Sequence, residues 1–229
     1  MKALVDLKMP IPIRVALMKH GIETLSCPEW EGLDKPVSSH PDMLFYPIER
    51  GRVLVGREYY EKNKAFFDAL PLEYILCDKT PSGKYPSDVL FDALGVKDTL
   101  YGKEGCVSTE LLSAFSRFVS VRQGYTRCSV AMLSDNCAVT SDKGIARALE
   151  KDGVDVLVIS EGHIRLDGYG TGFIGGAGVR LPDGEYLFFG DVLSHPDGEK
   201  ILSFADEHKI KTVSLSGIPL SDHGGLIIM

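Results

Sequence analysis

Side chains that can do chemistry occur just before several apolar segments of this sequence. They are two carboxylates, one thiol and their polar neighbours: Asp42, Asp88, Cys128, His40, Arg127, Asp222 and His223. Facing carboxylates can hold the planar N–H donors of a guanidinium group, a thiolate can attack its central carbon, and an imidazole can transfer protons. If the fold brings these residues together, they could act on a guanidino or amidino group.

Cys128 is the candidate nucleophile, because the charge of Arg127 beside it could stabilise a thiolate. His40 and His223 are the candidate acid and base. The sequence leaves the alternatives open, since a small buried thiol and turn histidines at the surface would show the same pattern.

The remaining polar residues of the set are candidate ligand contacts, namely Asp42, Asp88, Arg127 and Asp222. Two carboxylates brought close together would repel each other unless a cation lies between them or one of them takes up a proton. The expected ligand is therefore a small cationic molecule. The alternative is that Asp42 and Asp88 only form hydrogen bonds within their own turns.

Two literal motifs carry no cofactor prediction. Residues 170–175 spell GxGxxG, but a dinucleotide-binding loop must open a helix, and the following segment is typical of a hairpin. These glycines are interpreted as room for close packing at the centre. His195-Pro196-Asp197 is typical of a helix start. The six histidines show no HxH or HxxxH pair, so we expect no metal and no cofactor.

The segments that carry the candidate residues repeat one pattern. An apolar strand, a turn, a second strand, an amphipathic helix and a third strand occur in residues 40–78, 85–122, 125–160 and 172–215. Residues 222–229 add one strand, and residues 2–27 add a strand, a helix and a strand. Together these two ends would make a fifth unit whose first and last strands pair, which closes the open sheet edges.

Aligning the units places five residues at equivalent positions before their first strands: Asp42, Asp88, Cys128, Gly176 and Gly225. Their spacings are 40 to 49 residues. The pattern predicts an α/β fold, a five-bladed propeller of ββαβ units in one domain, residues 1–229, with the first strands around a central channel. A generic α/β protein is the alternative, although a doubly wound sheet would not place two strands before each helix.

A ring of five ββαβ units is the architecture of the pentein fold, and the sequence resembles the guanidino-group modifying superfamily, which includes arginine and agmatine deiminases, dimethylarginine hydrolases and amidinotransferases. It is most similar to a small bacterial family of that fold. His40-Pro41-Asp42-Met43 resembles the HxDM of agmatine deiminases, and residues 224–229, GGLIIM, resemble the closing GGxxC. Ile228 stands where the nucleophilic cysteine would be, so the usual nucleophile does not carry over.

The resemblance leaves two hypotheses open. One is a cysteine-dependent hydrolase or transferase that acts on a guanidino or amidino group, with Cys128 as a relocated nucleophile. The other is a small-ligand-binding or interaction protein of the same fold without catalysis, because a fold alone does not fix a function.

Composition limits the partners and the compartment. The 229 residues carry a net charge of −7, which would repel a nucleic acid. No apolar run approaches the roughly 20 residues that span a bilayer, and the first residues lack the apolar stretch of a signal peptide. Five cysteines without CxxC spacing are typical of free thiols in a reducing compartment. We therefore expect a cytoplasmic protein that does not bind membranes or nucleic acid.

Overall fold

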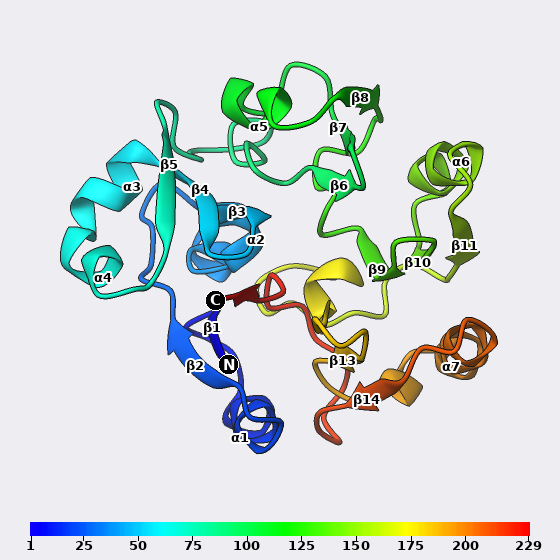
Figure 1. The fold of residues 1–229 in the computed structure, drawn as a ribbon. Coiled ribbons are helices and arrows are strands. Elements are labelled where there is room, and N and C mark those ends of the chain that lie inside the picture. The colour runs from blue at the N-terminus through cyan, green and yellow to red at the C-terminus, as the bar shows by residue number, and fades with distance from the viewer.

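The computed structural model describes residues 1–229 and contains five three-stranded sheets. In every sheet the first strand of the unit pairs antiparallel with the second, and the second pairs parallel with the third. Helical segments connect the second and third strands, so the predicted ββαβ order is confirmed in all five units. Figure 1 shows the units following one another around a common centre.

The units are numbered in the chain order of their first strands. The first contains α2 (Pro41–Leu44), β3 (Phe45–Glu49), β4 (Arg52–Gly56), α3 (Arg57–Lys62), α4 (Lys64–Asp68) and β5 (Glu73–Cys77). The third contains β9 (Val130–Ser134), β10 (Cys137–Thr140), α6 (Lys143–Lys151) and β11 (Asp155–Val158). The fifth contains β15 (Ile227–Ile228), β1 (Lys2–Val5), α1 (Ile11–Lys19) and β2 (Glu23–Ser26).

The second and fourth units have the same order of elements. The second contains β6 (Leu94–Val96), β7 (Thr99–Gly102), α5 (Thr109–Ser113) and β8 (Arg117–Ser120). The fourth contains β12 (Gly178–Arg180), β13 (Tyr186–Phe188), α7 (Gly198–Glu207) and β14 (Thr212–Ser214). Single 3₁₀ turns complete the chain: η1 (Lys35–Val37), η2 (Gly175–Ala177) and η3 (Val192–Ser194).

Helix α6 illustrates why these sequences form these elements. The side chain of Asp142 accepts hydrogen bonds from the N–H groups of Gly144 and Ile145, which caps the first turn. Ile145 and Leu149 lie one turn apart on the buried face, while the rest of the helix is charged. The helix therefore begins at its cap and packs its apolar stripe on the sheet.

The middle strand of each sheet is buried on both faces. In β4, Val53 and Val55 pack in one hydrophobic cluster with residues of the fifth unit, whereas Leu54 packs in another with residues of the second unit. Successive side chains of a strand point to opposite faces, which explains the uninterrupted apolar runs in the sequence. The other three clusters join the second unit to the third, the third to the fourth and the fourth to the fifth.

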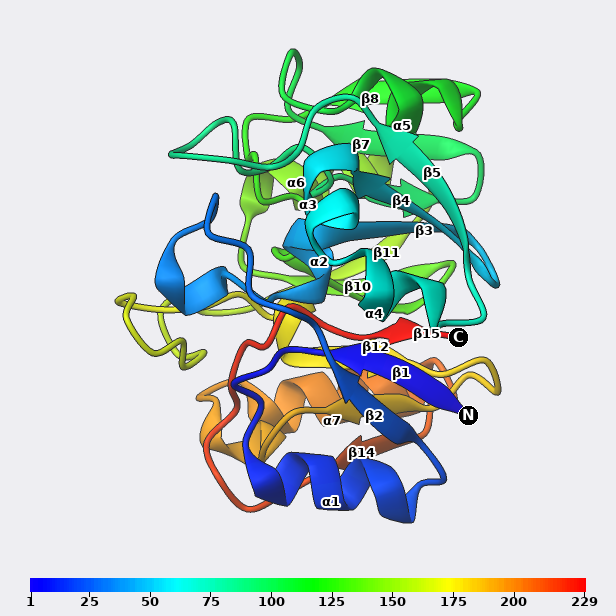
Figure 2. The same ribbon diagram turned by 90° about the vertical axis from the view of Figure 1, so that its left-hand side faces the viewer.

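The two ends of the chain complete the fifth sheet, as predicted. Strand β15 pairs antiparallel with β1, with Ala3 opposite Ile228 and Leu4 opposite Ile227. Figure 2 shows the two termini on the same side of the molecule. Ile228 packs against the apolar cluster between the fourth and fifth units, so its side chain has a packing role. No helix of the structure has the length and apolar character required to cross a membrane.

Candidate functional site

The turns that lead into the first strands meet at the centre of the molecule. The N–H of Asp42, from the first unit, donates to the carbonyl of Gly224 in the fifth at 3.1 Å. The N–H of Gly175, from the fourth unit, donates to the carbonyl of Cys128 in the third at 2.7 Å. Residues that are far apart in the sequence are therefore held together by main-chain hydrogen bonds.

Three glycines of the fourth unit make this approach possible. A Cβ at Gly176 or Gly172 would overlap the side chain of Asp222, and one at Gly175 would overlap the carbonyl of Arg127. The segment continues into η2 and β12 and not into a long helix. The interpretation of the motif glycines as room for packing is therefore confirmed for Gly172 and Gly175 and wrong for Gly170, where no atom lies within 4 Å of an added Cβ.

Cys128 lies between two buried carboxylates. Its Sγ is 2.9 Å from Oδ2 of Asp42 and 2.7 Å from Oδ2 of Asp92, and its N–H donates to Oδ1 of Asp92 at 2.9 Å. Burial and the nearby charges of Asp42 and Asp92 raise the pKa of Cys128 well above its usual value. Burial and the charge of Asp42 also raise the pKa of Asp92, to about 8. The thiol is therefore held in its neutral form.

The expected stabilisation of a Cys128 thiolate by Arg127 is wrong. The partners of the Arg127 guanidinium are in the first unit and not the thiol. It donates a hydrogen bond to the carbonyl of Phe45 at 3.0 Å, and it lies 5.5 Å from the ring centre of Tyr46. It lines a cavity of about 290 Å³ that Asp42 also lines and Cys128 does not. The carboxylates, and not Arg127, control the thiol.

The carboxylate that joins Asp42 at the centre is Asp92, not the predicted Asp88. Asp88 accepts a hydrogen bond from the hydroxyl of Tyr125 at 2.6 Å, and its other oxygen is buried without a partner. Asp92 lies two residues before β6, as Cys128 does before β9. A search for the residue two positions before each first strand would have identified Asp92. Matching by residue type instead selected Asp88, another acidic residue earlier in the same turn.

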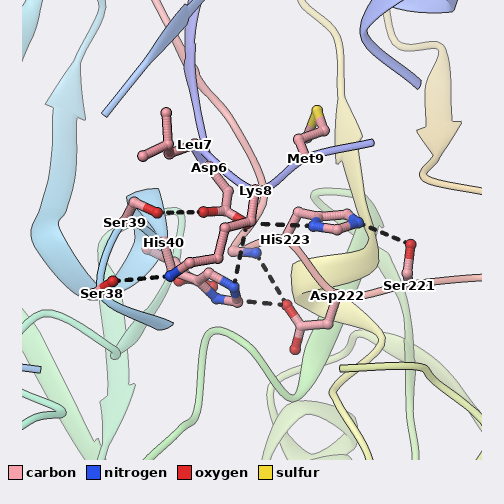
Figure 3. Close-up of polar contacts among 12 residues, drawn as sticks. Asp6, Leu7, Lys8, Met9, Ser38, Ser39, His40, Ser221, Asp222 and His223 are labelled. Atoms are coloured by element: carbon pink, nitrogen blue, oxygen red, sulfur yellow. Dashed lines mark hydrogen bonds and ion pairs between the residues drawn. The ribbon is translucent and has the colours of Figure 1, made fainter. Parts of the chain in front are cut away.

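A second polar cluster lies at one end of the centre, where Asp6 follows the last residue of β1. Oδ1 of Asp6 accepts a hydrogen bond from Ser39 at 2.5 Å. Its Oδ2 lies 3.4 Å from Nδ1 of His223 and 3.8 Å from Nε2 of His40 (Figure 3). Burial would raise the pKa of Asp6, but the hydrogen bond with His223, the charge of His40 and the hydrogen bond from Ser39 outweigh it, and the pKa is lowered. The sequence pattern did not indicate Asp6 as a site residue.

Asp222 closes this cluster from the other side of His40. Its Oδ1 lies 3.9 Å from Nδ1 of His40 and accepts the N–H of Gly224 at 3.0 Å, and its Oδ2 accepts the N–H of Phe173 at 2.9 Å. Burial raises the pKa of Asp222, although His40 opposes the shift. His40 thus lies between two buried carboxylates, which are 1% and 3% exposed at Asp6 and Asp222.

These residues line a cavity of about 500 Å³. Its polar lining consists of Asp6, Lys8, His40, Arg165, Asp167, Ser221, Asp222 and His223. Three predicted site residues, His40, Asp222 and His223, therefore share one cavity, whereas Cys128 and Asp88 do not line it. No group of His, Cys, Asp or Glu side chains has an arrangement that could hold a metal ion.

The arrangement of the five sheets is that of the pentein fold, which the chain shares with several solved structures. DDAH from Pseudomonas aeruginosa, as a mutant complexed with citrulline, matches with a TM-score of 0.55 and 9% identity over 94% of this chain and 92% of that one. An amidinotransferase of the saxitoxin pathway from Microseira wollei matches with a TM-score of 0.52 and 11% identity over 93% and 87%.

A third structure is similar as well. Inosamine-phosphate amidinotransferase from Streptomyces griseus matches with a TM-score of 0.51 and 10% identity over 90% of this chain and 73% of that chain. A comparison with curated proteins finds no match. The chain belongs to a family of unknown function, DUF6873, which matches residues 4–227.

Proposed function

We propose that this chain is a five-bladed α/β propeller that binds a small guanidino or amidino compound in the 500 Å³ cavity. The observation that carries the proposal is the pair of buried carboxylates, Asp6 and Asp222, on either side of His40. Carboxylates pair in two-point geometry with planar cations of this kind. The similar structures, two of which are amidinotransferases and one of which holds citrulline, support this ligand class.

The rim of the cavity favours a ligand that also carries a negative group. Lys8 and Arg165 line the cavity together with the carboxylates, and both are partly exposed and paired with an acidic side chain, Lys8 with Glu29 at 3.2 Å and Arg165 with Asp167 at 2.8 Å. A cationic head among the carboxylates would place an anionic tail near these two cationic side chains, where it can compete with their exposed partners. An arginine-like zwitterion therefore fits the cavity better than a simple cation.

A cysteine-dependent reaction at Cys128 has weaker support. Its thiol is 5% exposed, does not line the large cavity, and lies beside two carboxylates that oppose its ionisation. A bound substrate would be held on the other side of His40 and Asp222. Of the two hypotheses from the sequence, ligand binding without Cys128 chemistry is the better supported.

Titration calorimetry with agmatine and L-arginine tests this function, with citrulline, whose ureido group is uncharged, as the matched ligand. We expect saturable binding of a guanidinium ligand and at least tenfold weaker binding of citrulline. The change Asp222→Asn removes one charge at nearly constant volume. A hydrogen bond to a charged group contributes about 1.5–3 kcal/mol, so the affinity should fall about ten- to a hundredfold.

Asp88→Asn is the matched control, because Asp88 is also a buried carboxylate but lies outside the cavity. It should bind as the wild type does. The proposal is contradicted if neither guanidinium ligand binds, or if Asp88→Asn weakens binding as much as Asp222→Asn.

A further inference from the structure

Ser221, His223 and Asp6 form a continuous hydrogen-bonded chain in the wall of the cavity (Figure 3). Oγ of Ser221 lies 2.9 Å from Nε2 of His223, and Nδ1 of His223 lies 3.4 Å from Oδ2 of Asp6. The three side chains are nearly buried, yet all three border the cavity. This is the connectivity by which a histidine takes a proton from a serine hydroxyl while a carboxylate orients it.

The negative charge of Asp6 determines the direction in which a proton moves along this hydrogen-bonded chain. The lowered pKa of Asp6 keeps its carboxylate ionised, and the hydrogen bond from Ser39 holds its other oxygen. An ionised carboxylate beside Nδ1 favours the proton on that nitrogen. Nε2 of His223 then has a free lone pair that faces the hydroxyl of Ser221.

The main chain holds the serine and the histidine in place. The N–H of Ser221 donates to the carbonyl of Phe189 at 3.0 Å, and that of His223 donates to the carbonyl of Gly176 at 2.9 Å. Ser221 also forms an isolated parallel bridge with Arg165. The hydroxyl and the imidazole are thus fixed by the fourth unit, and Asp6 reaches them from β1, 217 residues away from His223.

We infer that Ser221 is the nucleophile of this cavity, with His223 as its base and Asp6 as the group that positions His223. The inference rests on the proposed function for the substrate, an amidinium or guanidinium carbon. The N–H groups of residues 221–225 are all engaged in hydrogen bonds, so they cannot form an oxyanion hole. Buried carboxylates would also repel an oxyanion, whereas attack on a cationic carbon produces a neutral adduct.

The reaction needs no reagent other than the substrate and water. Oγ of Ser221 forms a bond to the planar carbon while its proton passes to Nε2 of His223. The C–N bond then breaks, and His223 returns the proton to the departing ammonia. Water adds to the carbon while one of its protons passes to His223, and the C–O bond to the serine breaks as His223 returns that proton to Oγ. The product loses its second water proton to the released ammonia, so a ureido product, ammonium and free Ser221 result.

Covalent labelling with 2-chloroacetamidine, a cationic amidine that alkylates a nucleophile without forming an oxyanion, followed by peptide mass spectrometry, tests the nucleophile. We expect the acetamidine group on Ser221, no label on that peptide in Ser221→Ala, and slowing by about 100-fold or more in His223→Gln, since a positioned base contributes at least that factor. Ser120→Ala removes an exposed serine of β8 and should label as the wild type does. Melting temperatures verify that each variant is folded.

Ammonia release from agmatine and L-arginine tests the substrate class, and it should disappear in Ser221→Ala. A label on another serine, no label on folded wild type, or ammonia release that survives Ser221→Ala would each overturn the inference. Calorimetry on the wild type separates the two proposals. Binding without labelling refutes only the nucleophile, and labelling of Ser221 without binding of a guanidinium ligand refutes only the proposed function.

Discussion

Cys128 and Ser221 offer two different nucleophilic atoms, and their surroundings give them opposite properties. Cys128 has carboxyl groups on two sides, so ionisation would add a negative charge to a buried site where burial and these groups already oppose it. Ser221 has an imidazole at 2.9 Å, which can accept its proton at the moment of reaction. A serine needs such a base, whereas a cysteine needs a lowered pKa. The local charges therefore favour the hydroxyl as the reactive group.

The reactivity of Cys128 follows from this environment. With iodoacetamide at pH 7, we expect the half-exposed Cys106 to be alkylated first and native Cys128 to remain unmodified until the protein unfolds, because its thiol is buried and its pKa is raised. Quantitative mass spectrometry of the cysteine peptides measures both rates. Rapid labelling of native Cys128 that accelerates between pH 6 and pH 8 would restore it as a thiolate nucleophile.

At the scale of elements, the sequence pattern predicted the units better than the residues at their junctions. The order of apolar runs, turns and amphipathic helices located every sheet, because the middle strand of each sheet is buried on both faces. The position of a residue before its strand depends on the length of the turn. Asp42 is three residues before β3, but Asp88 is six before β6, so an alignment without structure chose Asp88 over Asp92.

Asp6 could not be predicted from the sequence, for a different physical reason. Its partners are distant in the chain, Ser39 in the loop that follows β2 and His223 four residues before β15. Local periodicity carries no information about which strand ends meet after the termini pair. The same limit applies to the hydrogen bond between Ser221 and His223, which depends on the backbone conformation of one short segment.

The close approach of the units at the centre makes a prediction about a single glycine. Gly176→Ala should lower the free energy of unfolding by about 1–3 kcal/mol, the usual cost of overpacking, because the new Cβ would overlap the carboxylate of Asp222. Gly170→Ala is the matched control, since no atom lies within 4 Å of a Cβ there. Denaturant unfolding of both variants measures the difference. Equal stability of the two would show that the centre can relax around an added methyl group.

At the scale of the whole molecule, stability and the candidate site depend on the same junction. Each hydrophobic cluster is shared by two neighbouring units, so no unit has a complete core of its own. The fifth sheet joins the two ends of the chain, and Ile227 packs in the cluster that reaches the first unit. The relay between Asp6 and His223 crosses this junction, so the cavity forms only when β15 is paired with β1.

Deletion of residues 224–229 should therefore abolish cooperative unfolding and not merely lower the melting temperature. The deletion removes β15, exposes the edge of β1, takes Leu226 and Ile227 out of two clusters, and removes the carbonyl of Gly224 that accepts from Asp42. A circular permutant is the control. The N–H of Met229 donates to the carbonyl of Lys2 at 2.9 Å, so a short Gly-Ser linker can join the ends.

New ends for this permutant can be placed between Glu161 and Gly162, in the exposed connection that follows β11. The permutant keeps every strand and should melt close to the wild-type temperature, whereas the deletion variant should show no thermal transition by calorimetry. A deletion variant that melts like the wild type would show that the first four units are stable without β15. An unfolded permutant with an intact linker would instead show that chain connectivity, and not pairing of the end strands, holds the fifth unit in place.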